Sequence, residues 1–182
     1  MEKDFAPDTL DVAAFARADA RLTGNDPLAR YPRLVEDITG SPEGHAVQWT
    51  ASGQWRTATG TAGHAWLHLS GDTVLPMTCQ RCLQPVDMPV GFETDFRFVA
   101  DERAAEAEDD ESEEDLLVLR RDFPLRELIE DELLLAMPPA PLHETCPVSL
   151  PTVAEDPNFA AAEEERSHPF AILAGLNKPK LP

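Results

Sequence analysis

The clearest hydrophobic pattern along the chain is a helical stripe between residues 125 and 136. Its apolar positions recur at intervals of three and four residues: Leu125, Leu128, Ile129, Leu133 and Ala136. That spacing puts them on one face of an α-helix, which Asp122 can cap and which tolerates Pro124 in its first turn. Pro138 and Pro139 then end the helix. We expect the apolar stripe to pack on a sheet. The acidic side chains of the segment fall on the opposite face, where we expect solvent: Glu127, Glu130 and Asp131.

A second helix, rich in alanine, is predicted near the N-terminus over residues 8–22. Val12, Phe15 and Ala16 follow helical spacing, and Asp11 can cap the N-terminus of this helix. The sequence Gly-Asn-Asp-Pro at residues 24–27 is typical of a turn and ends the helix.

Between residues 44 and 100 the pattern changes to β-branched and aromatic residues separated by turn signals, which is typical of strands. We expect strands at five places: 45–51, 54–57, 61–70, 73–78 and 86–99. Hairpin turns are expected at Ser52-Gly53 and at residues 70–72. The pattern predicts an α+β fold, with an antiparallel β-sheet or partial barrel, an N-terminal helix and one long packed helix after an acidic loop.

The acidic loop is the segment 101–115, which holds ten acidic residues and one basic residue. Like charges at this density oppose compaction, so we expect a disordered loop. After residue 150 the periodicity is lost. The expected organisation is a single α+β domain over residues 1–150, followed by an extended C-terminal tail over residues 151–182.

The net charge of the chain is -19, from 15 basic and 34 acidic residues. Phosphate backbones repel such a chain except at local basic patches, whereas basic proteins attract it. No apolar run approaches the ~20 residues of a membrane span, and the first residues do not resemble a signal peptide. Three cysteines, two of them in a Cys-x-x-Cys pair, favour a reducing compartment. We therefore expect a cytoplasmic protein.

The Cys-x-x-Cys pair, Cys79 and Cys82, is the strongest chemical motif of the chain. Downstream, His143 and Cys146 repeat the spacing, so that the four residues together offer the ligands that zinc prefers. The gap between the two pairs is wide, and two alternatives stay open. The cysteines can be a thiol-disulfide redox pair, or close free thiols. Arg81 lies between them, and its positive charge favours thiolates in each case.

Four arginines form the densest basic group of the chain: Arg17, Arg21, Arg30 and Arg33. They are either a solvated surface or a contact for RNA phosphates. The tail offers a second candidate contact, because the apolar patch that contains Phe170 is followed by Lys178 and Lys180. This patch is either a short docking motif or a segment that folds back on the core.

No constellation of base, nucleophile or phosphate loop accompanies the helix carboxylates. We therefore expect neither an enzyme nor a small-molecule substrate. The one enzymatic alternative is a thiol-disulfide oxidoreductase or redox sensor that uses Cys79 and Cys82. A site of the thioredoxin kind sits at the N-terminus of a helix in a βαβ unit, a context that the sequence does not predict.

Three segments in this order resemble one known family: Cys79-Gln80-Arg81-Cys82-Leu83 after a strand, the helix over residues 128–138, and the tail 168–176. The resemblance is to the bacterial YceD family, named large ribosomal RNA subunit accumulation protein. It implies a non-enzymatic role in ribosome biogenesis, with the large-subunit ribosomal RNA precursor or a basic ribosomal protein as partner. Relatives with additional cysteines after the helix fit zinc binding.

Overall fold

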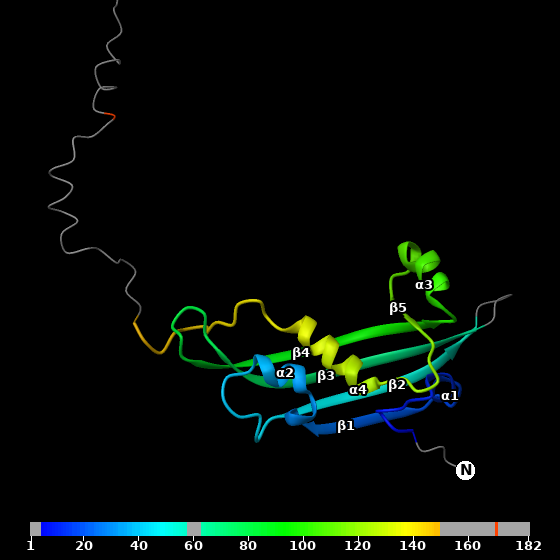
Figure 1. The fold of residues 1–182 in the computed structure, drawn as a ribbon, viewed down its shortest axis with the longest axis horizontal. Helices are drawn as coiled ribbons and strands as arrows, with labels where there is room; N and C mark the ends of the chain where they lie inside the picture. The colour runs from blue at the N-terminus through cyan, green and yellow to red at the C-terminus, as the bar shows by residue number, and fades with distance from the viewer. Residues whose placement is uncertain (1–4, 58–62, 150–169, 171–182) are drawn as a thin grey trace, which may run out of the picture. The chain divides into compact units, whose positions relative to one another are not determined.

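The computed structural model describes residues 5–57, 63–149 and 170. Its centre is a five-stranded sheet in the order β1-β2-β3-β4-β5 (Figure 1). The strands are β1 Arg21–Pro27, β2 Ala46–Arg56, β3 His64–Thr78, β4 Pro85–Val99 and β5 Asp115–Val118. The first four pair antiparallel, and β5 pairs parallel to β4. The sheet is therefore mixed, and the α+β class is confirmed, but the prediction of a purely antiparallel sheet is wrong.

Two predicted hairpin turns are absent, because β2 and β3 each run unbroken through them. The glycines that suggested these turns serve close packing instead. A Cβ on Gly53 would lie 2.5 Å from Cδ1 of Phe15, and one on Gly71 would lie 2.7 Å from Cε1 of Phe92. Glycine inside a strand often marks such a close approach. β2 and β3 are therefore longer than the sequence predicted, because Gly53 and Gly71 lie inside the strands and not in turns.

The N-terminal helix is shorter than predicted. Helix α1 spans only Val12–Arg17, with the Asp11 side chain accepting a hydrogen bond from the Ala14 amide as the expected cap. Asp19 has a φ of 47°, which takes the chain out of the helix, and β1 begins two residues later. The segment predicted to end the helix therefore belongs to an edge strand. A short helix η1 (Leu28–Arg30) and α2 (Pro32–Asp37) follow.

The long helix predicted from the hydrophobic stripe is present as α4, Leu125–Ala136. It packs on β3 and β4, and α2 lies on the same face of the sheet (Figure 1). Leu125, Ile129 and Leu133 are completely buried, as the stripe predicts. The N-cap residue is Pro124 and no side chain caps the helix, so Asp122 does not have the predicted role.

The acidic segment 101–115 contains regular structure where the sequence predicts a disordered loop. Helix α3 spans Glu102–Glu108 and η2 spans Asp109–Glu111. Asp101 caps α3 by accepting a hydrogen bond from the Ala104 amide. Arg97 on β4 forms ion pairs with Glu108 and Glu114. A counter-charge on the adjacent strand, which the local sequence does not reveal, offsets part of the repulsion.

The chain divides into two units, Met1–Cys146 and Pro147–Pro182. The sheet, the helices and all four cysteine and histidine residues of the motif belong to the first unit. Most of the predicted tail lies outside the described residues, so its extended form stays a prediction. Within the described residues, no helix has both the length and the apolar character needed to cross a membrane.

Candidate metal centre

The Cys-x-x-Cys pair lies in the turn that joins β3 to β4. Two backbone hydrogen bonds shape this turn, from the Cys79 amide to the Gln84 carbonyl at 2.9 Å and from the Leu83 amide to the Cys79 carbonyl at 2.9 Å. Leu83 has a φ of 59°, a conformation that is rare for a bulky residue. The turn directs both sulfurs inward, so Cys79 and Cys82 are buried while Leu83 is exposed.

The second pair of residues lies in the segment that follows α4. This segment is joined to the turn by a hydrogen bond of 2.8 Å from the Gln80 amide to the Pro141 carbonyl. The contact sets His143 and Cys146 beside the two buried thiols. A Cys-x-x-Cys turn and a His-x-x-Cys segment about 60 residues apart in sequence thus form one cluster, as the motif spacing predicts.

The four candidate ligand atoms all lie within 4.8 Å of one another. The sulfurs of Cys79 and Cys146 are 4.0 Å apart, and the sulfur of Cys82 is 3.3 Å from Nδ1 of His143. Tetrahedral zinc with ordinary bond lengths separates two sulfurs by about 3.8 Å, and a sulfur from a nitrogen by about 3.6 Å. The observed distances lie on both sides of these values. The donor set and its spacing therefore fit a four-coordinate zinc ion.

The imidazole of His143 is oriented for metal binding by its second nitrogen. Nε2 lies 2.9 Å from the Pro85 carbonyl, which can only accept a hydrogen bond, so Nε2 carries the proton. Nδ1 then presents its lone pair to the three sulfurs. Such a hydrogen bond on the far nitrogen is the usual way in which proteins fix the tautomer of a metal-binding histidine.

Arg81 joins the two halves of the cluster through its guanidinium group. Nε donates to the sulfur of Cys146 at 3.0 Å, and a terminal nitrogen donates to the His143 carbonyl at 2.7 Å. Three thiolates around a divalent cation carry a net charge of -1, which the guanidinium neutralises. The predicted influence of Arg81 on the thiols thus has a direct geometric basis.

The two cysteines of the turn have different acidities. Burial opposes ionisation of Cys79, but hydrogen bonds from the amides of His143, Cys82 and Arg81 outweigh it and lower the pKa of Cys79 to about 5. Burial raises the pKa of Cys82, and the neighbouring sulfurs of Cys146 and Cys79 add to this rise. The cluster therefore already favours one thiolate, and a cation is needed to stabilise several at once.

The surroundings of the Cys-x-x-Cys pair differ from those of a thioredoxin-like redox site. The Cys-x-x-Cys motif lies between two antiparallel strands, and no helix begins at either cysteine. Thioredoxin-like sites instead use a helix N-terminus after a strand. The three cysteines are free thiols in this structure.

The four predicted contact arginines do not form one exposed basic surface. The guanidinium of Arg17 stacks over the ring of Trp55 at 4.2 Å, and Arg30 pairs with Asp26 at 3.5 Å. Arg33 is held by Glu130 at 2.9 Å and by Asp131. Among the described residues only Arg21 of the four has no acidic or aromatic partner.

Glu130 is the residue that the sequence interpretation placed wrongly. It was expected on a solvated helix face, but it is 4% exposed and accepts hydrogen bonds from the Arg33 amide and side chain and from the Leu34 amide. It joins α4 to α2 and neutralises the charge of Arg33, which the sequence offered as a contact for RNA phosphates.

The predicted tail contact lies almost entirely outside the described residues. Phe170 is described and its side chain is 75% exposed. Lys178 and Lys180 are not described, so their contact with RNA or a partner stays a prediction.

Comparison with known families gives a match over most of the described sheet and the long helix. The family model described as large ribosomal RNA subunit accumulation protein YceD matches residues 67–177, which include β3, β4, α4 and all four residues of the cluster. No solved structure matches the chain.

Proposed function

The chain belongs to the YceD family, and on that premise we propose that it supports the synthesis, processing or accumulation of large-subunit ribosomal RNA by binding and without catalysis. The family match is the observation that carries this proposal. The name of the family connects it with accumulation of that RNA. The family name does not state which component of the large subunit the chain contacts.

We propose a basic ribosomal protein as the direct partner in preference to the RNA precursor. The net charge of -19 repels phosphate backbones. The arginines that the sequence offered for RNA are mostly engaged with acidic or aromatic side chains of the same chain. A basic protein, in contrast, is attracted by the whole charge of the chain.

We propose that the cluster of Cys79, Cys82, His143 and Cys146 holds a structural zinc ion. Four protein ligands complete a tetrahedral site and leave no position for water or substrate, which is typical of structural and not of catalytic zinc. Bound zinc, together with the Arg81 guanidinium, would balance the charge of the three thiolates, and it would connect the turn after β3 to the segment after α4. This role agrees with a protein that acts by binding.

The test of the proposed function is the ratio of mature large-subunit to small-subunit ribosomal RNA in a clean deletion strain. The expected result is a lower ratio, restored when the parent chain is expressed from a plasmid. An unchanged ratio in the deletion strain would rule the function out. If the Cys82→Ser chain also restores the ratio, the proposed function is supported, but zinc bound at the cluster is not required for it.

A further inference from the structure

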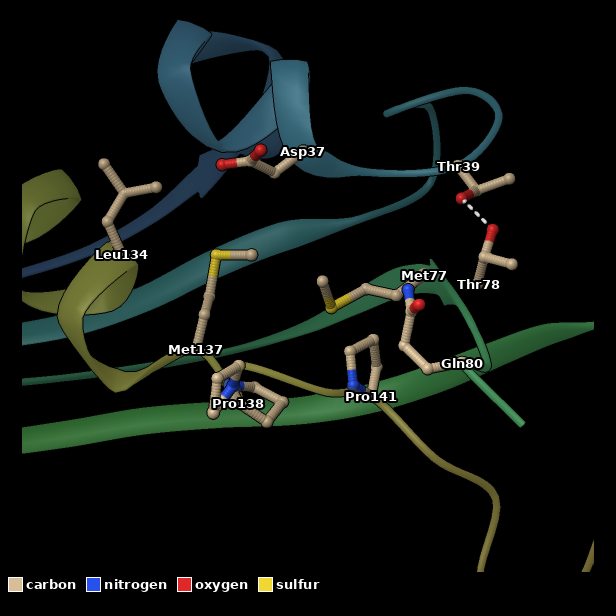
Figure 2. Close-up of a pocket in the computed structure, with 10 residues that line it drawn as sticks. Asp37, Thr39, Met77, Thr78, Gln80, Leu134, Met137, Pro138 and Pro141 are labelled. Carbon is tan, nitrogen blue, oxygen red and sulfur yellow. Dashed lines mark hydrogen bonds between the residues drawn. The ribbon is translucent and has the colours of Figure 1, made fainter. Parts of the chain in front are cut away.

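A groove of about 520 Å³ lies beside the metal cluster, between the end of α2, the end of β3 and the segment after α4 (Figure 2). Met77, Leu134 and Met137 line it together with three prolines, Pro138, Pro139 and Pro141. Figure 2 shows the thioether side chains of Met77 and Met137 extending into the space beneath α2. Six of the ten lining residues are thus apolar and the other four are polar or charged. The flexible methionines can adapt to the shape of an occupant.

Two walls of this groove belong to the segments that carry the metal ligands. Gln80 lines the groove from within the Cys79–Cys82 turn, and Pro141 lines it two residues before His143. The Gln80 amide donates to the Pro141 carbonyl at 2.8 Å, which joins these walls. An ion bound by the cluster would therefore hold both walls in place.

The third wall is held without the metal. The hydroxyls of Thr39 and Thr78 are 2.8 Å apart and share a hydrogen bond (dashed line in Figure 2). The Thr39 amide donates to the Pro76 carbonyl at 2.7 Å. These bonds fix the chain after α2 to the end of β3. Hydrogen bonds within the protein thus hold one side of the groove, whereas the opposite side includes the segments that carry the metal ligands.

Apolar side chains surround the same end of the molecule. Leu83, next to Cys82, is 72% exposed in its left-handed conformation, and Leu142, next to His143, is 44% exposed. A leucine that is both strained and exposed is uncommon on a protein surface unless that surface contacts another molecule. These residues extend the apolar surface beyond the groove itself.

The charge of the groove indicates what kind of molecule fits. Asp37 is its only charged lining residue, and this exposed carboxylate has no ion-pair partner among the described residues. No lysine or arginine lines the groove. An RNA would meet a negative charge and no cation in the groove. A basic polypeptide can instead place a cation beside Asp37 and an apolar side chain against the methionines.

We propose that this groove docks a basic protein of the large ribosomal subunit, which inserts an apolar side chain flanked by lysine or arginine, and that zinc completes the groove. The inference rests on the proposed function, which supplies the class of partner. The metal then controls binding indirectly, because it positions Gln80 and residues 138–141.

The experiment uses the zinc-loaded full chain, immobilised, and the nuclease-treated proteins of purified large subunits from the organism that encodes the chain. Retained proteins are identified by mass spectrometry, and the Kd of each is then measured with purified components. Met137→Lys places a positive charge inside the groove. Leu135→Lys is the matched control, because Leu135 is 80% exposed and outside the lining.

We expect a basic protein to be retained by the parent chain and by Leu135→Lys, with a Kd at least about tenfold weaker for Met137→Lys because like charges meet. Removal of zinc weakens the same Kd to a similar degree. Asp37→Asn weakens it about threefold, as loss of one partly exposed charge pair does, while Glu36→Gln leaves it unchanged. Melting curves verify that each variant folds.

Three results would overturn the docking proposal. The first is that no large-subunit protein is retained. The second is that Met137→Lys and Leu135→Lys bind the retained protein equally well. The third is that naked large-subunit ribosomal RNA binds the groove, as shown by a change in RNA binding in Met137→Lys, while no protein binds. The RNA ratio in cells separates this failure from failure of the function. If deletion lowers the ratio and Met137→Lys restores it fully, the function stands and the groove is not its binding site.

Discussion

The packing under α4 and the cysteine–histidine cluster connect the same parts of the chain by different chemistry. Under α4, the sheet meets the helix through Leu125, Ile129 and Leu133, all completely buried. At the cluster, the turn after β3 meets the segment after α4 through thiols, an imidazole and a guanidinium. The first contact is complete within the protein, and the second needs a cation before several thiolates can lie together.

This difference shows how the molecule divides its stability and its binding surface. Apolar burial requires no other component, so the sheet and α4 can stay folded when metal is absent. If the cluster binds zinc as proposed, the cluster end, which includes one side of the groove, would depend on metal supply and thiol chemistry. The variants below test whether the two regions respond separately, beginning with the largest expected effect.

Leu133→Asp tests the packing under α4. Leu133 is 0% exposed, so a carboxylate there must be desolvated without a partner, and we expect a loss of about 4 kcal/mol or more in the free energy of unfolding. Urea denaturation of the zinc-loaded protein measures it. Leu135→Asp, at an 80% exposed position of the same helix, should unfold nearly like the parent. Equal stability of the two variants would contradict the packing described here.

Cys82→Ser tests the cluster. Removing one ligand should release the metal and lower stability by about 3 kcal/mol, a smaller loss than that of Leu133→Asp because the core under α4 remains. Thermal melting with and without a chelator measures the effect. The parent should melt at a lower temperature in chelator, whereas Cys82→Ser should show no response. A chelator response that persists in the variant would place the metal elsewhere.

Glu130→Gln tests the connection between α4 and α2. The carboxylate accepts hydrogen bonds from Arg33 and Leu34, and bonds to a charged group are worth more than neutral ones. We expect a loss of about 2 kcal/mol in urea denaturation, with metal content unchanged. Glu127→Gln serves as the control. A loss of zinc in Glu130→Gln would show that the two regions are coupled.

Glu108→Gln tests the acidic segment and should have the smallest effect. Its hydrogen bond with Arg97 lowers the pKa of Glu108, so the stabilising contribution is present above the ordinary carboxyl pKa and is lost as the pH falls through the lowered value. The difference in Tm between parent and variant should therefore shrink towards zero on acidification. Glu106→Gln, an exposed neighbour on α3, should show no such difference at any pH.

The local pattern was sufficient wherever a structure depends on nearby residues. The stripe of Leu125, Ile129 and Leu133 predicted α4 because a helix repeats within a few residues. Each half of the cluster was likewise visible locally, as an x2 spacing of the kind that zinc sites use. The structure brings the two halves together, and zinc binding by them stays a prediction. These features carry their own geometry in the sequence.

Features that depend on distant contacts were missed. Gly53 and Gly71 suggested turns, since the sequence does not reveal that Phe15 and Phe92 lie against them. Glu130 suggested a solvated face, since its partner Arg33 is 97 residues away. The pairing of Arg97 with Glu108 and Glu114 likewise became visible only in the structure. In each case a partner from another strand or helix decided the outcome.

The most direct test of the central claim, that Cys79, Cys82, His143 and Cys146 hold a structural zinc ion, is the metal content of the full chain. The protein is purified under reducing conditions without chelator and analysed by elemental mass spectrometry. The account predicts about one zinc ion per chain in the parent, and loss of that zinc in both Cys82→Ser and His143→Gln. A content below about a tenth of an ion per chain in the parent would contradict it and leave close free thiols in its place.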